Sequence, residues 1–593
     1  MERFNFKVFK RFWAIARPYW IGDEKWKARG LLLLIVVLLL GYTGLSVVLN
    51  NQRGELISAL SAKSESRFWT TVGIFIGVLV AYAPLLAGYT YLRDRLGIEW
   101  RRWLTNSFIE RYFKDRAFYQ INQFHTEIDN PDQRIAEDVK SFTQESLTLA
   151  LVATDSVLEV IAFSGVLWGI SRELVLFLVA YAVVGTALTV GVFGQPLVRL
   201  NFEQLKREAN FRFSLVRVRE NAEAIAFYQG EEQESNQIKK RFLAAFNNYK
   251  SLLVWELSLN GLTNFYEFIP FVLPAIVVAP GVFSGELEVG KVSEAQGAFI
   301  RVFFSFNVIV SRLQSLTAFG AGIDRLYEFS EAIGYDTKTT KEAIKTEISK
   351  EEETDNRSES KATGKENNEA EAQPPVISFE TSDELILQSL TLQTPNYQRT
   401  LIEDLSLSVD GQSSLLVMGP SGCGKSSLMR AIAGLWTSGE GTIARPGLDD
   451  LLFLPQKPYM ILGSLRQQLL YPYSNVEIED DQLTYVLRQV NLPNLVAQFG
   501  LEAEAEWSDV LSLGEQQRLS FARVLLHQPK YVILDEATSA LDTTNEEQLY
   551  TQLAKAQTAY LSVGHRESLK NYHQSLLRLA EDHSWQMLSL EID

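Results

Sequence analysis

The sequence predicts a chain of two structural classes: an all-α domain of six transmembrane helices, followed by an α/β domain built around a phosphate-binding loop. Two observations support this division. Uninterrupted apolar runs crowd the first half of the 593 residues, whereas the second half consists of short apolar strands separated by turn residues. A chain of this length is also too long for a single hydrophobic core, so two domains are expected.

The bulk composition excludes two classes of protein. A net charge of −16 argues against a nucleic-acid-binding protein, because such a protein needs a basic face for the phosphate backbone. The single cysteine, Cys423, excludes an internal disulfide framework and fits a reducing compartment. We therefore expect no nucleic-acid partner.

The segment 1–29 is basic and aromatic, and it lacks the short apolar core and small-residue site of a cleavable signal peptide. Two interpretations remain open: a helix that lies in the membrane interface, or a cytosolic tail. The interfacial helix is favoured, because aromatic and basic side chains are interleaved just before a long apolar run. These side chains are Phe4, Lys7, Phe9, Lys10, Arg11, Phe12, Trp13, Arg17, Tyr19 and Trp20.

The transmembrane domain is expected over residues 30–336. Its first apolar run contains no charged residue and is long enough, at about 1.5 Å per residue, to cross the ~30 Å hydrocarbon layer. The sixth run is less apolar and carries Arg301. The six predicted spans are Gly30–Leu49, Phe68–Leu92, Leu147–Ile170, Leu174–Phe193, Leu262–Phe283 and Ser293–Val310.

The charges of the connecting segments predict the orientation in the membrane. The segments 1–29, 93–140 and 199–250 are rich in Lys and Arg, whereas the connections 50–67 and 171–173 carry few basic residues. The positive-inside rule then places both long loops and both termini in the cytoplasm. Helices that continue well beyond the bilayer would account for these two long cytoplasmic loops.

Several ionisable residues lie at membrane depth, where a charge is costly unless it faces a polar cavity or an internal partner. Asp155 and Glu159 are four residues apart and share one helix face. Two interpretations remain open: a hydrophilic substrate pathway or proton-titrating site, or structural pairs near helix ends. Pro270, Pro274 and Pro280 predict a kink or a break in the fifth span, which often accompanies a cavity wall. The candidate cavity residues are Asp155, Glu159, Glu267, Glu294 and Arg301.

A linker is predicted over residues 337–375. This segment is mostly Lys, Glu, Ser, Thr and Asn, with scarcely any large apolar residue. It cannot bury enough surface to offset the entropy of ordering, so we expect a flexible tether. The α/β domain then covers residues 376–593.

The α/β domain begins with a strand-like run, 413–418, that leads into a glycine-rich loop and a helical stretch. This is the context in which a phosphate-binding loop is expected, because its backbone N–H groups and the helix N-terminus surround phosphates. Lys425 is predicted to contact the β- and γ-phosphates of ATP, and Ser426 to bind Mg²⁺. The loop residues are Gly419, Pro420, Ser421, Gly422, Cys423, Gly424, Lys425, Ser426 and Ser427.

A second apolar strand, 531–534, ends in two carboxylates, Asp535 and Glu536. Asp535 suits the water shell of Mg²⁺, and Glu536 suits a general base that polarises the attacking water. Considered alone, the fragment could equally be a buried strand with a polar end.

The remaining motifs together resemble those of ABC ATPases, and they follow in the order of that family. Residues 511–518 (Leu-Ser-Leu-Gly-Glu-Gln-Gln-Arg) resemble the family signature, and residues 539–542 resemble the loop that crosses the dimer. Gln456 matches the glutamine loop, His565 the switch histidine, and Tyr397 the aromatic residue that stacks on adenine. The resemblance identifies the whole chain as a six-helix transmembrane domain of the ABC exporter type, fused to an ABC nucleotide-binding domain.

The resemblance implies a head-to-tail pair of ATPase domains, with each ATP between one phosphate loop and the partner's signature. Ser512 and Gly514 would complete the γ-phosphate site in trans, and a homodimer would have two equivalent sites. It also implies catalytic roles for Glu536, His565, Lys425 and Gln456. The metal ligands implied are Ser426, Gln456 and Asp535, and the ATP contacts implied include Tyr397, Ser512, Gly514 and Asp542. Leu513 and Glu515 depart from the usual glycine and glutamine of the signature, but the serine and glycine donors are kept.

Segments of the membrane domain resemble the peroxisomal (D-type) half transporters and their bacterial relatives, the fused permease–ATPases linked to vitamin B12, bleomycin and antimicrobial-peptide uptake. These segments are 130–139 and 219–231. The resemblance implies that the stretches 131–139 and 222–230 carry the mechanical linkage to the ATPase domains.

The function predicted is a homodimeric, ATP-driven transporter in a bacterial plasma membrane, in contact with membrane lipid. Its cargo would be a polar or amphipathic solute: a cobalamin-like compound, a peptide, or an acyl or lipid compound. The alternative is an ATP-gated channel or receptor that does not pump. The presence of both Glu536 and His565 favours pumping.

Overall fold

The computed structural model describes residues 6–124, 128, 130–334, 375–473, 476–556 and 558–590. The chain divides into two compact units, Met1–Ala362 and Thr363–Asp593. The boundary falls within the predicted linker, 337–375, which lies outside the described residues except for its last position.

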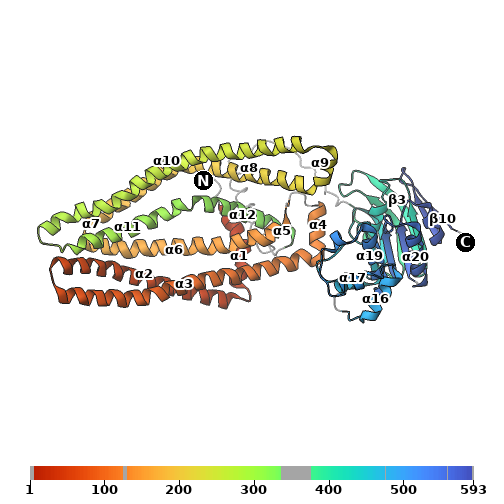
Figure 1. Ribbon diagram of the computed structural model, residues 1–593, viewed down its shortest axis with the longest axis horizontal. Coiled ribbons are helices and arrows are strands. Elements are labelled where there is room, and N and C mark those ends of the chain that lie inside the picture. The colour runs from red at the N-terminus through yellow and green to blue at the C-terminus, as the bar shows by residue number, and fades with distance from the viewer. Residues whose placement is uncertain are drawn as a thin grey trace, which may run out of the picture. The chain divides into compact units, whose positions relative to one another are not determined.

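The first unit is helical, and its long helices run side by side as an elongated bundle (Figure 1). The long helices are α2 (Lys25–Ser61), α3 (Glu65–Phe113), α6 (Val139–Ile170), α7 (Arg172–Thr189), α8 (Gln195–Glu220), α10 (Glu231–Phe283) and α11 (Gly290–Ser311). The shorter helices are α1 (Phe6–Ile21), α4 (Ala117–Phe124), α5 (Pro131–Gln133), α9 (Ala222–Tyr228) and α12 (Leu313–Ala332). Irregular helical turns connect them at Lys114–Arg116, Arg134–Asp138 and Val190–Gly194.

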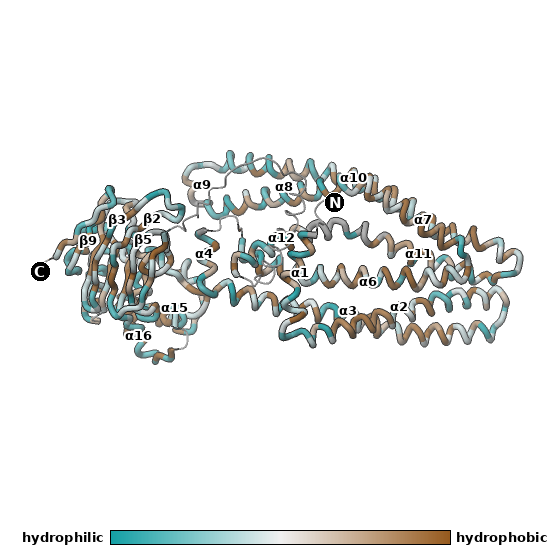
Figure 2. Tube along the Cα trace, turned by 180° about the vertical axis from the view of Figure 1, so that it is seen from behind, coloured by the Kyte–Doolittle hydropathy of each residue, from teal (hydrophilic) through white to brown (hydrophobic). Residues whose placement is uncertain are grey.

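Five of the described helical segments are long and apolar enough to cross a membrane. Figure 2 shows hydrophobic residues along α2, α3, α6, α7 and the adjoining part of α10, and hydrophilic residues over much of α8 and α9. Both long loops predicted to be cytoplasmic are largely helical: α3 continues to Phe113, and α8 and α10 extend to Glu220 and from Glu231. The helices are therefore much longer than the predicted spans, as the prediction of extended helices requires.

The predicted sixth span forms a helix, α11, but this helix is not among the five apolar segments. Its 22 residues include Lys291, Glu294 and Arg301, which lower its hydropathy. The helix packs against α2, α6, α7 and α10. Its polar side chains therefore find partners in the protein, which allows a less apolar sequence than a lipid-facing helix requires.

No break interrupts the fifth span. Pro270, Pro274 and Pro280 all lie inside the single continuous helix α10, so the broken helix that the prolines suggested is wrong. Figure 1 shows that α10 is curved rather than straight. A proline in a transmembrane helix is tolerated where neighbouring groups satisfy the freed carbonyls, and both Pro270 and Pro274 are buried against other helices.

Within the segment 1–29, the residues Phe6–Ile21 form helix α1, which packs on the bundle, and the residues from Lys25 onward already belong to α2. Ile15, Ala16 and Tyr19 are buried in a core shared with α2, α3, α6 and α12. On the opposite side, Phe9 and Trp13 remain exposed. A helix with one face on protein and aromatic side chains on the other suits the membrane interface predicted for this segment.

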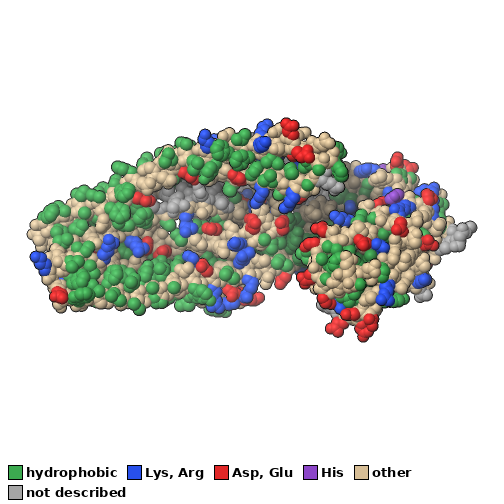
Figure 3. Space-filling view, viewed as in Figure 1, with side chains coloured by type: hydrophobic (Ala, Val, Ile, Leu, Met, Phe, Trp, Pro, Cys, Tyr) green, Lys and Arg blue, Asp and Glu red, His purple; other side chains and the backbone are tan. Residues whose placement is uncertain are grey.

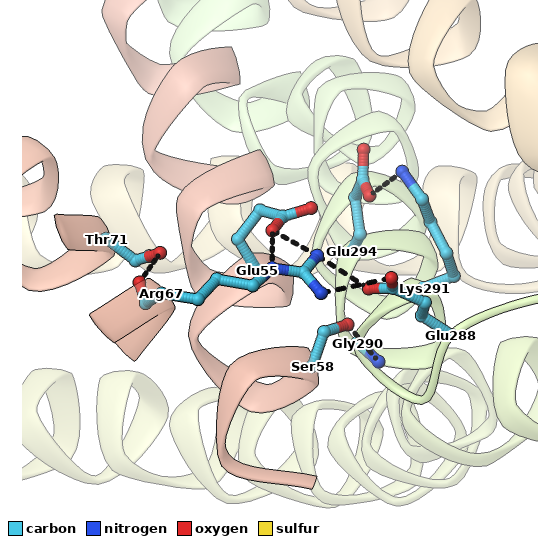
Figure 4. Close-up of polar contacts among 8 residues, drawn as sticks. All are labelled: Glu55, Ser58, Arg67, Thr71, Glu288, Gly290, Lys291 and Glu294. Atoms are coloured by element: carbon cyan, nitrogen blue, oxygen red, sulfur yellow. Dashed lines mark hydrogen bonds and ion pairs between the residues drawn. The ribbon is translucent and has the colours of Figure 1, made fainter. Parts of the chain in front are cut away.

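Helices α2 and α11 approach very closely near one end of the bundle. A Cβ atom on Gly290 would lie 1.9 Å from the carbonyl oxygen of Gly54, which is closer than any real contact. The Gly290 N–H donates to Ser58 Oγ over 3.1 Å (Figure 4). Arg67 holds this end with hydrogen bonds to Glu55 and Glu288. Glycine is thus required at position 290 by the packing of two backbones.

Replacing Gly290 with alanine should destabilise the bundle by about 1–3 kcal/mol, because the added methyl forces α2 and α11 apart. We expect a lower midpoint of thermal unfolding for detergent-solubilised Gly290→Ala. Gly44→Ala is the matched control, because a Cβ on Gly44 of α2 meets no atom within 4 Å. Equal midpoints for the two variants would contradict the close packing.

The second unit contains two sheets among the described residues. The larger has the strand order β10-β9-β4-β8-β7-β6, parallel except for β10, and the smaller has the order β1-β5-β2-β3. The larger sheet comprises β4 (Ser414–Met418), β6 (Leu451–Leu454), β7 (Tyr531–Asp535), β8 (Ala559–Val563), β9 (Ser575–Leu579) and β10 (Trp585–Ser589). The smaller comprises β1 (Ser378–Thr381), β2 (Leu385–Gln393), β3 (Thr400–Val409) and β5 (Gly439–Arg445).

Helices cover the larger sheet and bury its apolar strands. The helices are α14 (Lys425–Ile432), α15 (Leu465–Leu470), α16 (Asp480–Gln489), α17 (Leu495–Phe499), α18 (Trp507–Val510), α19 (Leu513–His527) and α20 (Thr543–Lys555). Strands β4, β7 and β8 are buried almost throughout, as parallel strands covered on both faces should be. Because these strands are parallel, the residues that follow them gather at one edge of the sheet.

Candidate nucleotide-binding site

The phosphate-binding loop lies where the sequence predicts it, between β4 and α14. Gly422 and Gly424 have φ angles of +81° and +102°, which L side chains rarely adopt. A Cβ on Gly419 would lie 2.6 Å from the carbonyl oxygen of Leu579, so this position also admits only glycine. The loop therefore forms a tight backbone cradle at the N-terminus of a helix, a favourable place for phosphate groups.

The side chains of Lys425 and Cys423, both in the loop, point into different surroundings. Lys425 Nζ donates to the carbonyl oxygens of Gly419 and Pro420, over 2.8 and 2.7 Å, so its ammonium group folds across the cradle. Cys423, in contrast, is only 5% exposed and its side chain belongs to the hydrophobic core beneath the loop. The predicted ATP contact of Cys423 can therefore come only from its backbone.

The two residues predicted to bind Mg²⁺ through oxygen are brought together by the sheet. Ser426 Oγ donates to Asp535 Oδ1 over 3.1 Å, although 109 positions separate the residues in sequence. Burial raises the pKa of Asp535 above its ordinary value, and the neighbouring Glu536 adds to the shift. A hydroxyl and a carboxylate are oxygen donors of the kind that Mg²⁺ prefers. The third predicted metal residue, Gln456, contacts Glu536 instead.

Glu536 lies between two further predicted catalytic residues. Gln456 Nε2 donates to Glu536 Oε2 over 2.9 Å, and His565 Nδ1 is 4.0 Å from Glu536 Oε1. The backbone of Glu536 has φ +49°, which is uncommon for a residue other than glycine. Its N–H donates to the carbonyl of Val563 at the end of β8, which holds this conformation. Gln456 thus holds the carboxylate directly, the backbone bond fixes the position of the residue, and the His565 ring lies nearby.

The signature segment begins helix α19 with a reciprocal cap. Ser512 Oγ accepts from the Glu515 N–H, and Glu515 Oε2 accepts from both the N–H and the hydroxyl of Ser512, over 2.9 and 2.7 Å. These bonds lower the pKa of Glu515. They also account for a glutamate at this position, because a capping box accepts either Glu or Gln. Ser512 and Leu513 are exposed, and Gly514 is packed close to the Ala540 carbonyl.

Gln517 joins three parts of the site, and the sequence reasoning missed it. Its Nε2 donates to the carbonyl of Gln456 over 3.1 Å and to Ser539 Oγ over 3.2 Å, while its Oε1 accepts from the Ala540 N–H. The side chain is buried. Its place within the signature motif is the only sequence signal, because a glutamine on a helix is otherwise an ordinary surface residue.

Two predicted ATP contacts have mainly structural partners in the described residues. Asp542 is the N-cap of α20 and accepts from the Asn545 N–H over 2.8 Å. Tyr397 lies in the turn between β2 and β3, with φ +56° and its N–H bonded to the Thr394 carbonyl. Its ring is partly exposed.

Three of the five candidate cavity residues cluster in the helical unit. Arg301 Nη1 is 3.0 Å from Glu159 Oε1, and Ser305 Oγ donates to Glu159 Oε2 over 2.7 Å. Asp155 lies near this pair and bonds with the Tyr42 hydroxyl. Its Oδ1 atom is buried without a partner among the described residues.

The other two candidate cavity residues lie apart from that cluster. Glu294 pairs with Lys291 over 2.6 Å near the end of α11 that faces Arg67 (Figure 4). Glu267 is half-buried on α10. Two of the acidic candidates fit the interpretation as structural pairs, because they form the ion pairs Glu159–Arg301 and Glu294–Lys291. Asp155 fits the polar pathway better, because one of its buried oxygens has no partner among the described residues.

The fold and the site define a membrane-embedded ATPase, and comparison with known proteins gives its family. Residues 16–283 match the model of ABC transporter transmembrane region 2, and residues 402–539 match the ABC transporter ATPase model. The chain belongs to the ABC transporter family, as a half transporter related to its D-type members. It is therefore an ATP-binding membrane protein whose ATPase activity is coupled to transport.

Three relatives cover nearly the whole chain. An uncharacterized ABC transporter ATP-binding protein of Synechocystis sp. is 43% identical over 95% of this chain and 82% of its own length. The chloroplastic ABC transporter D family member 2 of Arabidopsis thaliana is 38% identical, over 97% and 86%. The lysosomal cobalamin transporter ABCD4 of Homo sapiens is 31% identical, over 91% and 89%.

Replacing Gln517 with alanine should lower the kcat of ATP hydrolysis about ten-fold, equivalent to roughly 1.4 kcal/mol of barrier, with a smaller effect on KM. The reason is that Gln517 holds the Gln456 backbone and the 539–540 loop in register. The matched control is Gln548→Ala, which removes a comparable bond to the Gln489 carbonyl on α16. An equal loss in both variants would indicate a general packing effect and contradict a positioning role.

Proposed function

We propose that this protein is a homodimeric transporter that moves a polar or amphipathic solute across a membrane by alternating access. The observation that carries the proposal is the convergence of Gln456, Glu536 and His565 beside the Ser426–Asp535 pair. The described part of the same chain also has five membrane-length apolar helices. An intact constellation of this kind supports hydrolysis rather than simple nucleotide binding.

Glu536 acts in this proposal as the general base for the attacking water. Gln456 orients its carboxylate through a hydrogen bond, and His565 lies 4.0 Å from the other carboxylate oxygen. Lys425 would exchange its two carbonyl partners for phosphate oxygens when ATP enters the cradle. A positioned base and a fixed cation are the groups that phosphoryl transfer requires.

Ser426, Asp535 and Gln456 would hold Mg²⁺. The fit rests on the Ser426–Asp535 distance of 3.1 Å, which sets a hydroxyl and a carboxylate oxygen side by side at the end of the cradle. When bound, the cation would neutralise phosphate charge. The carboxylate of Asp535 must be ionised to bind it, and its raised pKa lets it take up a proton more readily when the cation is absent.

A second copy of the chain completes the site. Ser512 is exposed, and its hydroxyl is bonded within its own capping box rather than to the phosphate loop. The N-terminus of α19 presents N–H groups and a positive dipole end, which favour an anion. We infer that Ser512 and Gly514 meet the γ-phosphate held by the partner, with Asp542 and Tyr397 contributing at the dimer face and at adenine.

Helix α9 is our candidate for mechanical coupling. Phe227 and Tyr228 are 78% and 87% exposed at the turn between α8 and α10, so they are available to contact an ATPase domain. The other stretch implied by the resemblance, 131–139, is anchored in the helical unit: Arg134 is buried and donates to the Arg325 carbonyl of α12. That stretch would transmit motion through α12 and α6.

The Asp155 cluster supports polar or amphipathic cargo. The Asp155 oxygen, which is buried and has no partner in the described part of the chain, lies beside the Glu159–Arg301 pair and suits a donor group on a solute. The human relative is named a cobalamin transporter, which is compatible with such a cargo. A cobalamin-like compound, a peptide and an acyl or lipid compound all remain in this class. The bacterial plasma membrane is the proposed location.

The test compares wild-type protein with Glu536→Gln in sealed vesicles supplied with ATP outside, using a labelled cobalamin, peptide or acyl compound as cargo. Loss of the base should lower ATP turnover by at least about 10²-fold and abolish uphill accumulation, while ATP binding is kept. Glu547→Gln is the control, because Glu547 lies outside the site on α20. ATP-dependent flux that runs only downhill in both proteins would favour the gated channel or receptor.

A further inference from the structure

A cavity of about 370 Å³ opens between the end of α1, the turn before α2, and the part of α3 that continues beyond its membrane span. This volume falls in the range of small-molecule sites. Tyr19 and Trp103 form its aromatic wall, Glu24, Glu99 and Glu110 supply three carboxylates, and Arg102 supplies one guanidinium group. None of these residues belongs to the nucleotide site or to the intramembrane cluster.

The aromatic wall is rigid. Tyr19 stacks on Trp100 with ring centroids 5.6 Å apart and lies 5.6 Å from Trp103. Trp20 meets Trp100 edge-on at 5.5 Å. Tyr19 and Trp100 are buried, so their orientations are set by packing. Aromatic faces held in place in this way attract cations, most strongly where water is partly excluded.

The charges of the cavity suit a zwitterion better than a simple anion or cation. Glu99 is bonded to Arg102 and lies 3.6 Å from Lys27, which also approaches Glu24 at 3.8 Å. Glu110 makes no ion pair with any other described residue. The side chain of Arg102 is 63% exposed and donates to Glu99 through one nitrogen, so further N–H groups are available to an acceptor.

The field inside the cavity is negative near its wall. Burial, together with the charges of Glu24 and Glu99, raises the pKa of Tyr19 to about 12, and Arg102 opposes the shift. An ammonium group is therefore favoured beside Tyr19, and a phosphate is favoured beside Arg102, where guanidinium and phosphate geometries match.

The predicted spans place the cavity near the border of the membrane, on the side of the N-terminus. Glu24 precedes by six positions the uncharged run that starts at Gly30, and Glu99 follows by seven positions the span that ends at Leu92. Trp26 and Ile98 are 76% and 63% exposed beside the cavity residues in sequence. Figure 3 shows charged side chains gathered where α2 begins, and hydrophobic ones along α2 and α3. Tryptophan at this level is typical of the membrane interface.

We propose that this cavity binds the headgroup of a zwitterionic phospholipid of the ethanolamine type from the leaflet on the ATPase side. Its phosphate lies against Arg102, and its ammonium group lies against Tyr19, Trp103 and the carboxylates of Glu24 and Glu110. The acyl chains follow the apolar surface that Trp26 and Ile98 begin. Bound lipid ties α1 to α3 and stabilises the helical unit. The proposal does not depend on ATP hydrolysis or on the identity of the cargo.

The test uses the full-length protein in detergent, titrated with short-chain phosphatidylethanolamine while thermal unfolding is followed. The lipid should raise the unfolding midpoint saturably, and its apparent affinity should fall at least ten-fold in Arg102→Gln and in the double variant Glu24→Gln/Glu110→Gln. Arg102→Lys should retain part of the affinity, since it keeps a cation for the phosphate. The matched controls Arg53→Gln and Glu65→Gln change exposed residues at the opposite end of α2 and α3 and should bind as wild type.

Two further arms decide the chemistry. Phosphatidylglycerol has the phosphate but no ammonium group, so it should bind more weakly, and the double glutamine variant should not weaken its binding further. Free phosphoethanolamine should also bind more weakly, because it has no chains to cover the apolar surface. Equal binding of phosphatidylglycerol, equal binding of free phosphoethanolamine, or unchanged affinity in both cavity variants would each overturn the proposal.

Discussion

The nucleotide site is organised around the hydrogen bond between Ser426 Oγ and Asp535 Oδ1. Parallel pairing places β8 between β4 and β7, so the residues that follow these strands meet at one sheet edge. Glu536 directly follows Asp535 at this edge, and its N–H is bonded to the carbonyl of Val563 at the end of β8. Any shift in strand register would separate the phosphate loop from both carboxylates. Buried strands make such a shift costly, which explains why a site from distant sequence segments is pre-organised.

In the helical unit, close packing of backbones takes the place of hydrophobic attraction between helices. Gly54 and Gly290 let α2 and α11 touch, and Arg67 fastens the adjoining turn through Glu55 and Glu288. Within lipid, close packing and internal polar bonds are the main forces between helices. The charged residues of α11 are tolerated because each has a partner inside the protein: Arg301 pairs with Glu159 on α6, and Lys291 pairs with Glu294 on α11 itself.

Most of the fold, and the residues that the structure brings together at the candidate nucleotide site, could be predicted from the sequence, because their signals are local. A glycine loop between a strand and a helix predicts a phosphate site, and an uncharged apolar run of about 20 residues predicts a membrane span, without knowledge of the tertiary neighbours. Other features depend on tertiary neighbours. The side chain of Cys423 turns into the core although its backbone lines the loop. Helix α10 continues through three prolines, of which Pro270 and Pro274 are buried against neighbouring residues. The role of Gln517 could not be predicted, because its partners come from distant loops. The capping role of Glu515 depends on the local geometry at the start of α19.

The most direct measurement asks whether two chains share each ATP site. Lys425→Ala disables the phosphate loop, and Gly514→Asp disables the signature; each variant alone should hydrolyse no ATP. In a two-fold dimer with shared sites, a mixed pair of these variants contains one fully intact site. Differently tagged chains, co-expressed and purified through both tags, should therefore recover about half of the wild-type rate. Mixed pairs that remain as inactive as the parent variants would contradict the account.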